Sequence, residues 1–343
     1  MTSASTQGAS TAANPGRAVL RSFGDRLAER VATRRSQIVL GLDPDPARLW
    51  PDAIRRADNP DNPDNPDNPD NPDNPDSLEA VTPAACAARA VAAHCALVIE
   101  ATAQECVAAK LQVACFERLG AAGWSVLAET VALAREHGLL VIADAKRGDV
   151  DVTAAAYAQA FLGETPSPYG SIPGLGADAM TVNPLLGRDS LEPFVTTARA
   201  RGRGLFVLVR TSNPGASDVQ ERSLADGSAV SEHLAELVDE IGAGGVGTTG
   251  LSDVGAVVGA TAPGRLAALR ELMPHAVFLL PGVGAQGGTV EELAPAFACG
   301  PAGGLISASR GIVAAHERAG GDPAAAAARE AARLRELAWR LVA

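Results

Sequence analysis

Eight short apolar runs, rich in β-branched residues, alternate along the chain with longer Ala- and Leu-rich stretches of helical periodicity. The apolar runs span residues 37–42, 107–113, 139–143, 179–183, 205–209, 254–260, 277–280 and 304–307. The helical stretches span residues 83–100, 123–137, 151–162, 190–201, 231–241, 265–273, 289–298 and 324–341. Strands that are each followed by a helix, eight times over, are typical of a (β/α)8 TIM barrel. We therefore predict a single α/β domain over residues 17–343, with an N-terminal helix before the first strand.

Two segments lie outside this alternation. Residues 1–16 are predicted to form a disordered polar tail. Residues 58–76 contain the triplet D-N-P six times, and each Pro removes an amide donor and disfavours a helix at the residue before it. We predict a disordered low-complexity loop insertion here. It is either a repeat tolerated on the surface or an acidic docking arm.

The barrel prediction has a consequence within the sequence, because such barrels carry their chemistry at the C-terminal ends of the strands. Polar side chains do follow the predicted strands: Asp43, Asp144 and Lys146, Asn183, Thr211 and Ser212, Thr261, Gln286, and Arg310. A doubly wound sheet would instead place one nucleotide-binding loop near its switch point. The distribution favours the barrel.

The densest group of charges is the hexapeptide D-A-K-R-G-D at residues 144–149. Residues two apart on an extended strand end point to the same side, so Asp144 and Lys146 are both expected to face the barrel mouth. A lysine beside carboxylates stays protonated, which suits it to protonate a carbanion. A solvated cluster of ion pairs is the alternative interpretation.

A second lysine, Lys110, lies inside the apolar run 107–113. Burial of an ammonium group is costly unless a carboxylate compensates it, and Asp144 on the next strand is the natural partner. Alternatively, the Lys110 side chain reaches the rim and stays hydrated.

Two glycine-rich segments match G-x-G-x-x-G, one at residues 245–250 and one within residues 281–288. Neither has an acidic residue about 20 positions further on that follows a second strand, as a dinucleotide fold needs. The second follows the seventh strand, and Arg310 follows the eighth, which is the usual phosphate site of such barrels. Ordinary turns beside an ion-paired Arg310 are the alternative.

Composition excludes some function classes. The net charge is −11, seven of the acidic residues lie in residues 58–76, and only 12 residues are aromatic, which argues against a nucleic-acid surface. No apolar run approaches the ~18 residues of a membrane span. The five cysteines form no C-x-x-C pair and are expected to be buried thiols of a cytoplasmic protein.

Several blocks in barrel order carry a resemblance to a known family. They are Gly41-Leu42-Asp43-Pro44, residues 110–117, the D-x-K-x-x-D signature of Asp144, Lys146 and Asp149 followed by Val150 and Thr153, Thr181-Val182-Asn183-Pro184, residues 211–215, residues 281–288, and Ser309-Arg310-Gly311-Ile312. The chain resembles the orotidine 5'-phosphate decarboxylases, in their longer bacterial branch. The resemblance covers about residues 19–315, with the D-N-P loop as an insertion.

The resemblance implies a cofactor-independent decarboxylation of orotidine 5'-monophosphate to UMP and CO2, the last step of de novo UMP synthesis. It implies that Lys110, Asp144, Lys146 and Asp149 form the catalytic network, with Lys146 as proton donor. It also implies a homodimer in which Asp149 and Thr153 reach the neighbouring subunit's site. The implied substrate contacts are Asp43 and Lys110 to the ribose, Ser212 and Pro281 to the base, and Gln286 and Arg310 to the phosphate.

Two alternatives stay open at this point. Magnesium-dependent sugar-phosphate decarboxylases and aldolases of similar barrels share the D-x-K-x-x-D signature and hold the metal with carboxylates. A catalytically silent phosphate-ligand binder that uses the acidic loop would be expected to have a broken charged network. The intact network and the blocks at residues 211–215 and 281–288 favour the decarboxylase.

Overall fold

The structure, a computed structural model, describes residues 20–58, 82–284 and 287–343. The predicted tail at residues 1–16, residues 59–76 of the predicted insertion and Gln286 lie outside these ranges, so what was predicted for them stays a prediction.

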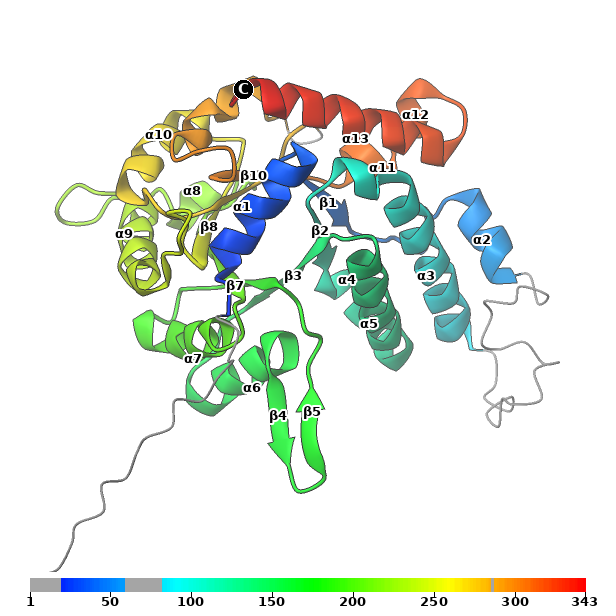
Figure 1. The fold of residues 1–343 in the computed structure, drawn as a ribbon, viewed down its shortest axis with the longest axis horizontal. Helices are drawn as coiled ribbons and strands as arrows, with labels where there is room; N and C mark the ends of the chain where they lie inside the picture. The colour runs from blue at the N-terminus through cyan, green and yellow to red at the C-terminus, as the bar shows by residue number, and fades with distance from the viewer. Residues whose placement is uncertain (1–19, 59–81, 285–286) are drawn as a thin grey trace, which may run out of the picture.

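Eight parallel strands close into a barrel, as the alternation of the sequence predicted (Figure 1). They are β1 (Ile38–Leu42), β2 (Ala108–Gln112), β3 (Leu140–Arg147), β6 (Ala179–Val182), β7 (Gly204–Arg210), β8 (Val254–Val258), β9 (Phe278–Pro281) and β10 (Gly304–Ala308). Each strand pairs with the next along the chain, and β1 pairs with β10 to close the ring. The predicted third strand ended at residue 143, whereas β3 runs on to Arg147. Asp144 and Lys146 therefore belong to the strand itself.

Helices surround the barrel. The α-helices are α1 (Phe23–Arg34), α2 (Pro51–Asp58), α3 (Pro83–Thr102), α4 (Val113–Glu117), α5 (Gly120–Glu136), α6 (Asp151–Leu162), α7 (Arg188–Arg199), α8 (Ala216–Val219), α9 (Val230–Gly242), α10 (Pro263–Leu272), α11 (Arg310–Val313), α12 (Ala315–Ala319) and α13 (Pro323–Arg340). The 3-10 helices are η1 (Ala103–Glu105), η2 (Ala243–Gly245) and η3 (Glu291–Phe297). The helix predicted at residues 289–298 was wrong in type, because Pro295 inside it lacks the amide donor that an α-helix needs.

The predicted N-terminal helix closes one end of the barrel. Phe23, Leu27 and Val31 of α1 are buried together with residues of the barrel interior. The ring of Phe23 meets Phe206 of β7 edge to face, with the ring centroids 5.9 Å apart. This packing fills the end of the barrel that lies opposite the polar strand ends.

The G-x-G-x-x-G segment at residues 245–250 forms hydrogen bonds with helix α1. The Asp25 carboxylate accepts hydrogen bonds from the amides of Thr248 and Thr249, at 3.1 and 2.8 Å. A side chain of α1 thus occupies the amides that a phosphate would use. The finding agrees with the prediction that this segment is not a dinucleotide site.

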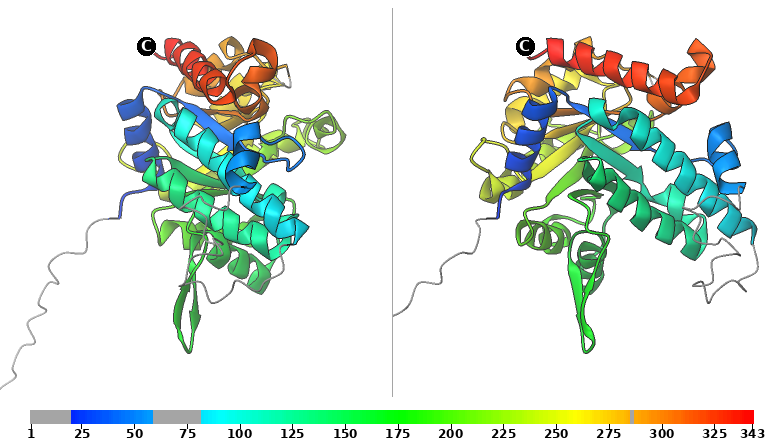
Figure 2. Two further views of the ribbon diagram at one scale, coloured as in Figure 1. Left: turned by 90° about the vertical axis from the view of Figure 1, so that its right-hand side faces the viewer. Right: turned by 45° about the vertical axis from the view of Figure 1, so that its right-hand side comes forward.

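One element was not predicted. β4 (Glu164–Ser167) and β5 (Gly170–Pro173) form an antiparallel hairpin after α6. Figure 2 shows the hairpin projecting away from the barrel. Its strands are four residues long, mostly exposed and interrupted by prolines, so they lack the alternation of apolar residues that reveals a strand.

By length and composition, one helix of the described chain, Pro83–Glu105, could cross a membrane, contrary to the expectation from the sequence. That criterion is weak for a single helix. Here α3 contacts α2, α5 and α13, and its Val91, Val98 and Ile99 side chains are buried. The buried side chains of α3 thus pack against other helices of the helical layer.

Because His94 of α3 is buried, we expect the free energy of unfolding to depend on pH. The His94 ring accepts a hydrogen bond from the Trp50 amide at 3.1 Å, and burial, together with nearby His316, lowers the His94 pKa to about 4. The unfolded chain takes up this proton near pH 6.5 but the folded chain takes it up only near pH 4, so the stability is lost as the pH falls between those values. We expect a loss of about 3 kcal/mol from pH 7 to pH 4. The measurement is urea unfolding at both pH values.

The control variant is His94→Gln, which keeps an acceptor for the Trp50 amide. Its free energy of unfolding should fall by about 3 kcal/mol less over that pH range, and an equal loss in both proteins would contradict the assignment to His94.

Candidate active site

A cavity of about 360 Å3 opens at the C-terminal ends of the strands. This is a volume suited to a small-molecule ligand. Of the ten residues predicted for the site, seven line it: Asp43, Lys110, Asp144, Lys146, Ser212, Pro281 and Arg310. Gln286 lies outside the described residues, and Asp149 and Thr153 do not line the cavity.

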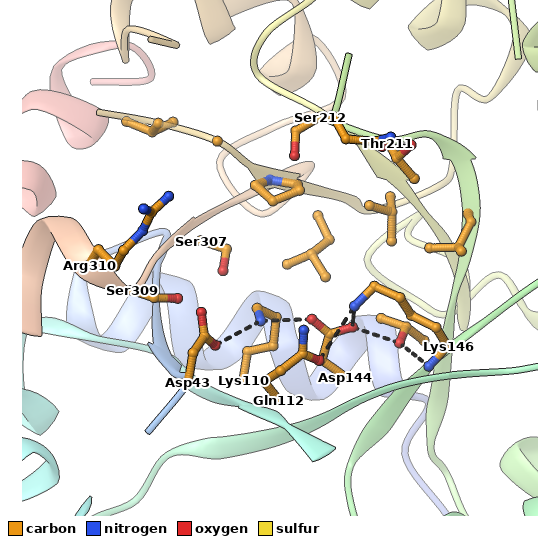
Figure 3. A pocket seen from close by; sticks show the side chains of 18 of the residues that line it. Asp43, Lys110, Gln112, Asp144, Lys146, Thr211, Ser212, Ser307, Ser309 and Arg310 are labelled. Carbon is orange, nitrogen blue, oxygen red and sulfur yellow. Dashed lines mark hydrogen bonds and ion pairs between the residues drawn. The ribbon is translucent and has the colours of Figure 1, made fainter. Parts of the chain in front are cut away.

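The Asp144 carboxylate lies between two ammonium groups (Figure 3). The Lys110 Nζ atom is 2.8 Å from Asp144 Oδ2, and the Lys146 Nζ atom is 2.5 Å from Asp144 Oδ1. On its other side, Lys110 Nζ lies 3.8 Å from Asp43 Oδ1. The four side chains form one row of alternating charge. The contacts of Asp144 with Lys146 and with Lys110 were predicted from the sequence, whereas the row ends at Asp43 and does not include Asp149, the fourth member of the implied network.

Burial fixes the charges of this row. The side chains of Lys110 and Asp144 are 7% and 9% exposed. Burial alone would raise the pKa of the Asp144 carboxyl, but the charges of Lys110 and Lys146 outweigh it and hold that pKa well below its usual range. Burial alone would lower the pKa of Lys110, but Asp144 and then Asp43 raise it. The Lys110 ammonium and the Asp144 carboxylate therefore stay ionised at neutral pH.

The two ammonium groups differ in access. Lys110 is buried at the level of the strands, whereas the Lys146 side chain is 43% exposed and also lies 3.5 Å from Gln112 Oε1. Lys146 can therefore approach a ligand in the cavity, while Lys110 compensates the buried carboxylate.

The amino-acid composition also distinguishes these two residues, a signal that the motifs alone do not carry. Lys110 and Lys146 are the two lysines of the 343-residue chain, against 27 arginines. A guanidinium group stays protonated at any ordinary pH, whereas an ammonium group can give up a proton. Both lysines of the chain thus lie beside Asp144, and all the other Lys or Arg positions are arginine.

Thr181 of β6 also belongs to the site and was not predicted as a functional residue. Its hydroxyl donates a hydrogen bond to Asp144 Oδ1 at 2.9 Å and accepts one from the Lys146 amide at 2.9 Å. The available signal was its place at a strand end, beside Asn183, in the T-V-N-P block.

A cationic and polar group lies at the Asp43 end of the row. The cavity is lined there by Ser307, which lies in β10, and by Ser309 and Arg310, which follow it (Figure 3). Within the described residues, no acidic side chain forms an ion pair with Arg310. Gly41 makes this proximity possible, because a Cβ at that position would lie 1.8 Å from the Ser309 hydroxyl oxygen.

Thr211 and Ser212 lie across the cavity from the charged row, on the segment after β7 (Figure 3). The Thr211 amide donates to Gln220 Oε1 at 2.7 Å, and Arg210 pairs with Glu221 at 2.8 Å. These bonds attach residues 211–221 to the end of β7. That the segment moves as a lid stays a prediction.

Asp149 and Thr153 lie outside the cavity, in a stretch of the chain with exposed apolar side chains. Asp149 accepts a hydrogen bond from the Val150 amide at 2.8 Å, and Thr153 is exposed on the first turn of α6. Val152 is 83% exposed and Leu185, after β6, is 77% exposed. The single chain therefore leaves Asp149 half-buried and Thr153, Val152 and Leu185 exposed to solvent.

The fold is a closed (β/α)8 barrel, and its cavity lies at the strand ends where TIM-barrel enzymes carry their active sites. This cavity brings together the Lys-Asp-Lys row and the Arg310 guanidinium. A sequence model described as the orotidine 5'-phosphate decarboxylase / HUMPS family matches residues 36–329. The chain belongs to this family.

Individual relatives agree with the family assignment. An orotidine 5'-phosphate decarboxylase of Rhodopirellula baltica is 46% identical over 234 residues, which cover 67% of this chain and 75% of the relative. One of Haloarcula marismortui is 41% identical over 297 residues, covering 87% and 88%. The solved structure of Leishmania donovani OMP decarboxylase is 31% identical with a TM-score of 0.64, covering 93% of this chain and 99% of that one.

Proposed function

We propose that this protein decarboxylates orotidine 5'-monophosphate to UMP and CO2, the last step of de novo pyrimidine nucleotide synthesis. The observation that carries the proposal is the buried Asp144 carboxylate held between Lys110 and Lys146 on one side of the cavity. The relatives named as orotidine 5'-phosphate decarboxylases support this choice of substrate. The charged row accounts for the chemistry.

In the proposed mechanism, the bond between C6 of the pyrimidine and the carboxylate carbon breaks, and its electron pair stays on C6. The Lys146 ammonium stabilises this developing negative charge and then transfers one proton to C6, which balances the reaction to UMP and CO2. The ionised Asp144 lies on the side of the departing carboxylate, where it orients Lys146 and repels the substrate charge.

The substrate takes one orientation in this proposal. Arg310, with Gln286, holds the phosphate, and Asp43 with Lys110 holds the ribose hydroxyls. Ser212 contacts the pyrimidine edge and Pro281 packs near the base. The reacting carbon then lies at the Lys146 end of the row. Binding energy from the distant phosphate fixes the reacting end and favours closure of the segment after β7.

We further propose a homodimer that completes each site. Asp149 and Thr153 then face the cavity of the neighbouring subunit, and the exposed Val152 and Leu185 side chains lie in the interface. Two supporting observations are that neither polar residue lines its own cavity and that the apolar side chains beside them are uncovered.

The test of the activity is the loss of orotidine 5'-monophosphate absorbance with the purified protein, with and without excess EDTA. We expect conversion to UMP at the same rate in both, because the proposed mechanism uses protein side chains alone. Conversion that EDTA abolishes would favour the magnesium-dependent sugar-phosphate enzymes of similar barrels. A folded protein that converts no substrate would contradict the proposal.

Shared sites are tested by mixing two inactive variants. Lys146→Met and Asp149→Asn homodimers are unfolded together, refolded as a mixture and assayed. Random pairing places both substitutions in one site of each hybrid and leaves the other site intact, so about one quarter of the wild-type activity returns. If both residues act in the same subunit's site, the mixture stays as inactive as its components.

A further inference from the structure

β3 contains more residues than its neighbour β6 at the level of the active site. Ala143 pairs with Met180, and Arg147 pairs with Val182. Three residues, 144–146, therefore lie opposite Thr181 alone. The ordinary ladder cannot continue through such an irregularity, and bulges of this kind redirect side chains next to active sites.

The backbone of Lys146 has an unusual conformation within this irregular stretch. Its φ angle is 50°, in the left-handed region that a residue with a side chain adopts only when its surroundings hold it there. Its amide donates to the Thr181 side-chain hydroxyl at 2.9 Å, where a regular ladder would offer a main-chain carbonyl. Thr181 is 1% exposed, so its hydroxyl has no ready substitute in bulk water.

The Thr181 hydroxyl also contacts the Asp144 carboxylate, whose two oxygens bind different lysines. A threonine hydroxyl has one proton to donate, and Thr181 gives it to Asp144 Oδ1 at 2.9 Å. That oxygen also holds the Lys146 ammonium, whereas Oδ2 holds Lys110. The Thr181 hydroxyl is thus hydrogen-bonded both to the backbone amide of Lys146 and to the Asp144 carboxylate, which in turn binds the Lys146 ammonium.

We infer that Thr181 is a positioning residue for the proton donor, an inference that rests on the proposed function. Its hydroxyl keeps Lys146 in the left-handed conformation and turns the Asp144 carboxylate so that each oxygen faces one lysine. The Lys146 side chain is long and 43% exposed, so without this anchor its ammonium would visit positions away from the reacting carbon.

The kinetic test compares Thr181→Val, which keeps the shape and removes the hydroxyl, with Thr181→Ser, which keeps the hydroxyl. For Thr181→Val we expect kcat for orotidine 5'-monophosphate to fall about 10- to 100-fold, since a hydrogen bond to a charged group is lost. We expect KM and the Kd of UMP to change less than about threefold, because the contact acts on the proton donor and not on the bound ligand. Thr181→Ser should stay within about threefold of the wild-type kcat.

The outcomes separate this inference from the proposed function. A wild-type protein that converts no substrate contradicts the proposed function. An active wild type with an equally active Thr181→Val variant overturns the positioning role, and so does a loss seen equally in Thr181→Val and Thr181→Ser.

A crystal structure of Thr181→Val supplies a readout that does not depend on activity. We expect Lys146 to leave its left-handed conformation and its ammonium to move from Asp144, and an unchanged Lys146 overturns the inference. If Thr181→Val does not fold, Thr181→Ala replaces it in the same comparison with Thr181→Ser.

Discussion

Replacing Lys146 with methionine is expected to lower kcat for orotidine 5'-monophosphate by about 10⁴-fold or more. General acid catalysis contributes about 10²- to 10⁴-fold, and loss of a preorganised charge at the developing anion costs a further 10²- to 10³-fold. The chain has no third lysine that could take over the proton transfer. The measurement is single-turnover conversion with enzyme in excess, beside the Kd for UMP.

Lys146→Arg is the matched control for charge. It keeps a cation beside Asp144, so the fold and the ligand affinity should stay near wild type, but the guanidinium does not release a proton. We expect kcat to remain depressed at least about 10³-fold. An arginine variant that works nearly as well as the wild type would show that a positive charge is sufficient and would contradict the assignment of Lys146 as proton donor.

Asp144→Asn is expected to damage both stability and activity. The Lys110 ammonium, 7% exposed, would retain only Asp43, whose nearest oxygen is 3.8 Å away. Leaving a buried charge without its partner costs about 3–5 kcal/mol. Activity should fall as well, because the variant no longer orients Lys146 with a negative charge. Urea unfolding at fixed protein concentration measures the first effect, and the absorbance assay measures the second.

The double variant Lys110→Met/Asp144→Asn separates the two effects. It removes the buried cation together with its partner, so more than half of the lost stability should return, since an apolar replacement of a buried ion pair is often neutral or better. The activity should not return, because the network acts as a unit. A double variant as unstable as Asp144→Asn alone would mean that the cost does not come from the uncompensated ammonium of Lys110.

Much of the fold could be predicted because its signals are local. The alternation of apolar runs and helical stretches predicted all eight barrel strands, and α6 was predicted at residues 151–162 with both ends correct. The failures also have local causes. The β4–β5 hairpin lacks apolar alternation, and Pro295 changed the helical type of η3.

The residues of the candidate site also fall into those that the sequence predicted and one that it did not. Residue type and position at strand ends predicted Asp43, Asp144, Lys146 and Arg310, because parallel strands in a barrel bring their C-terminal ends together. Lys110 was predicted because a charge inside an apolar run needs a partner. Thr181 escaped prediction because its role depends on a register shift between β3 and β6. No pattern within either strand specifies how two strands are offset from one another.

Periodicity, motif order and residue chemistry are properties of short segments, so the barrel, the family and the charged residues of the site could be predicted without a structure. The tertiary structure decided which atoms of those residues meet. It placed one carboxylate between the two lysines, gave Lys146 its left-handed backbone and put Asp149 and Thr153 outside the cavity of their own chain. These outcomes depend on packing between strands that are distant in the sequence, and burial there makes the charges interact strongly.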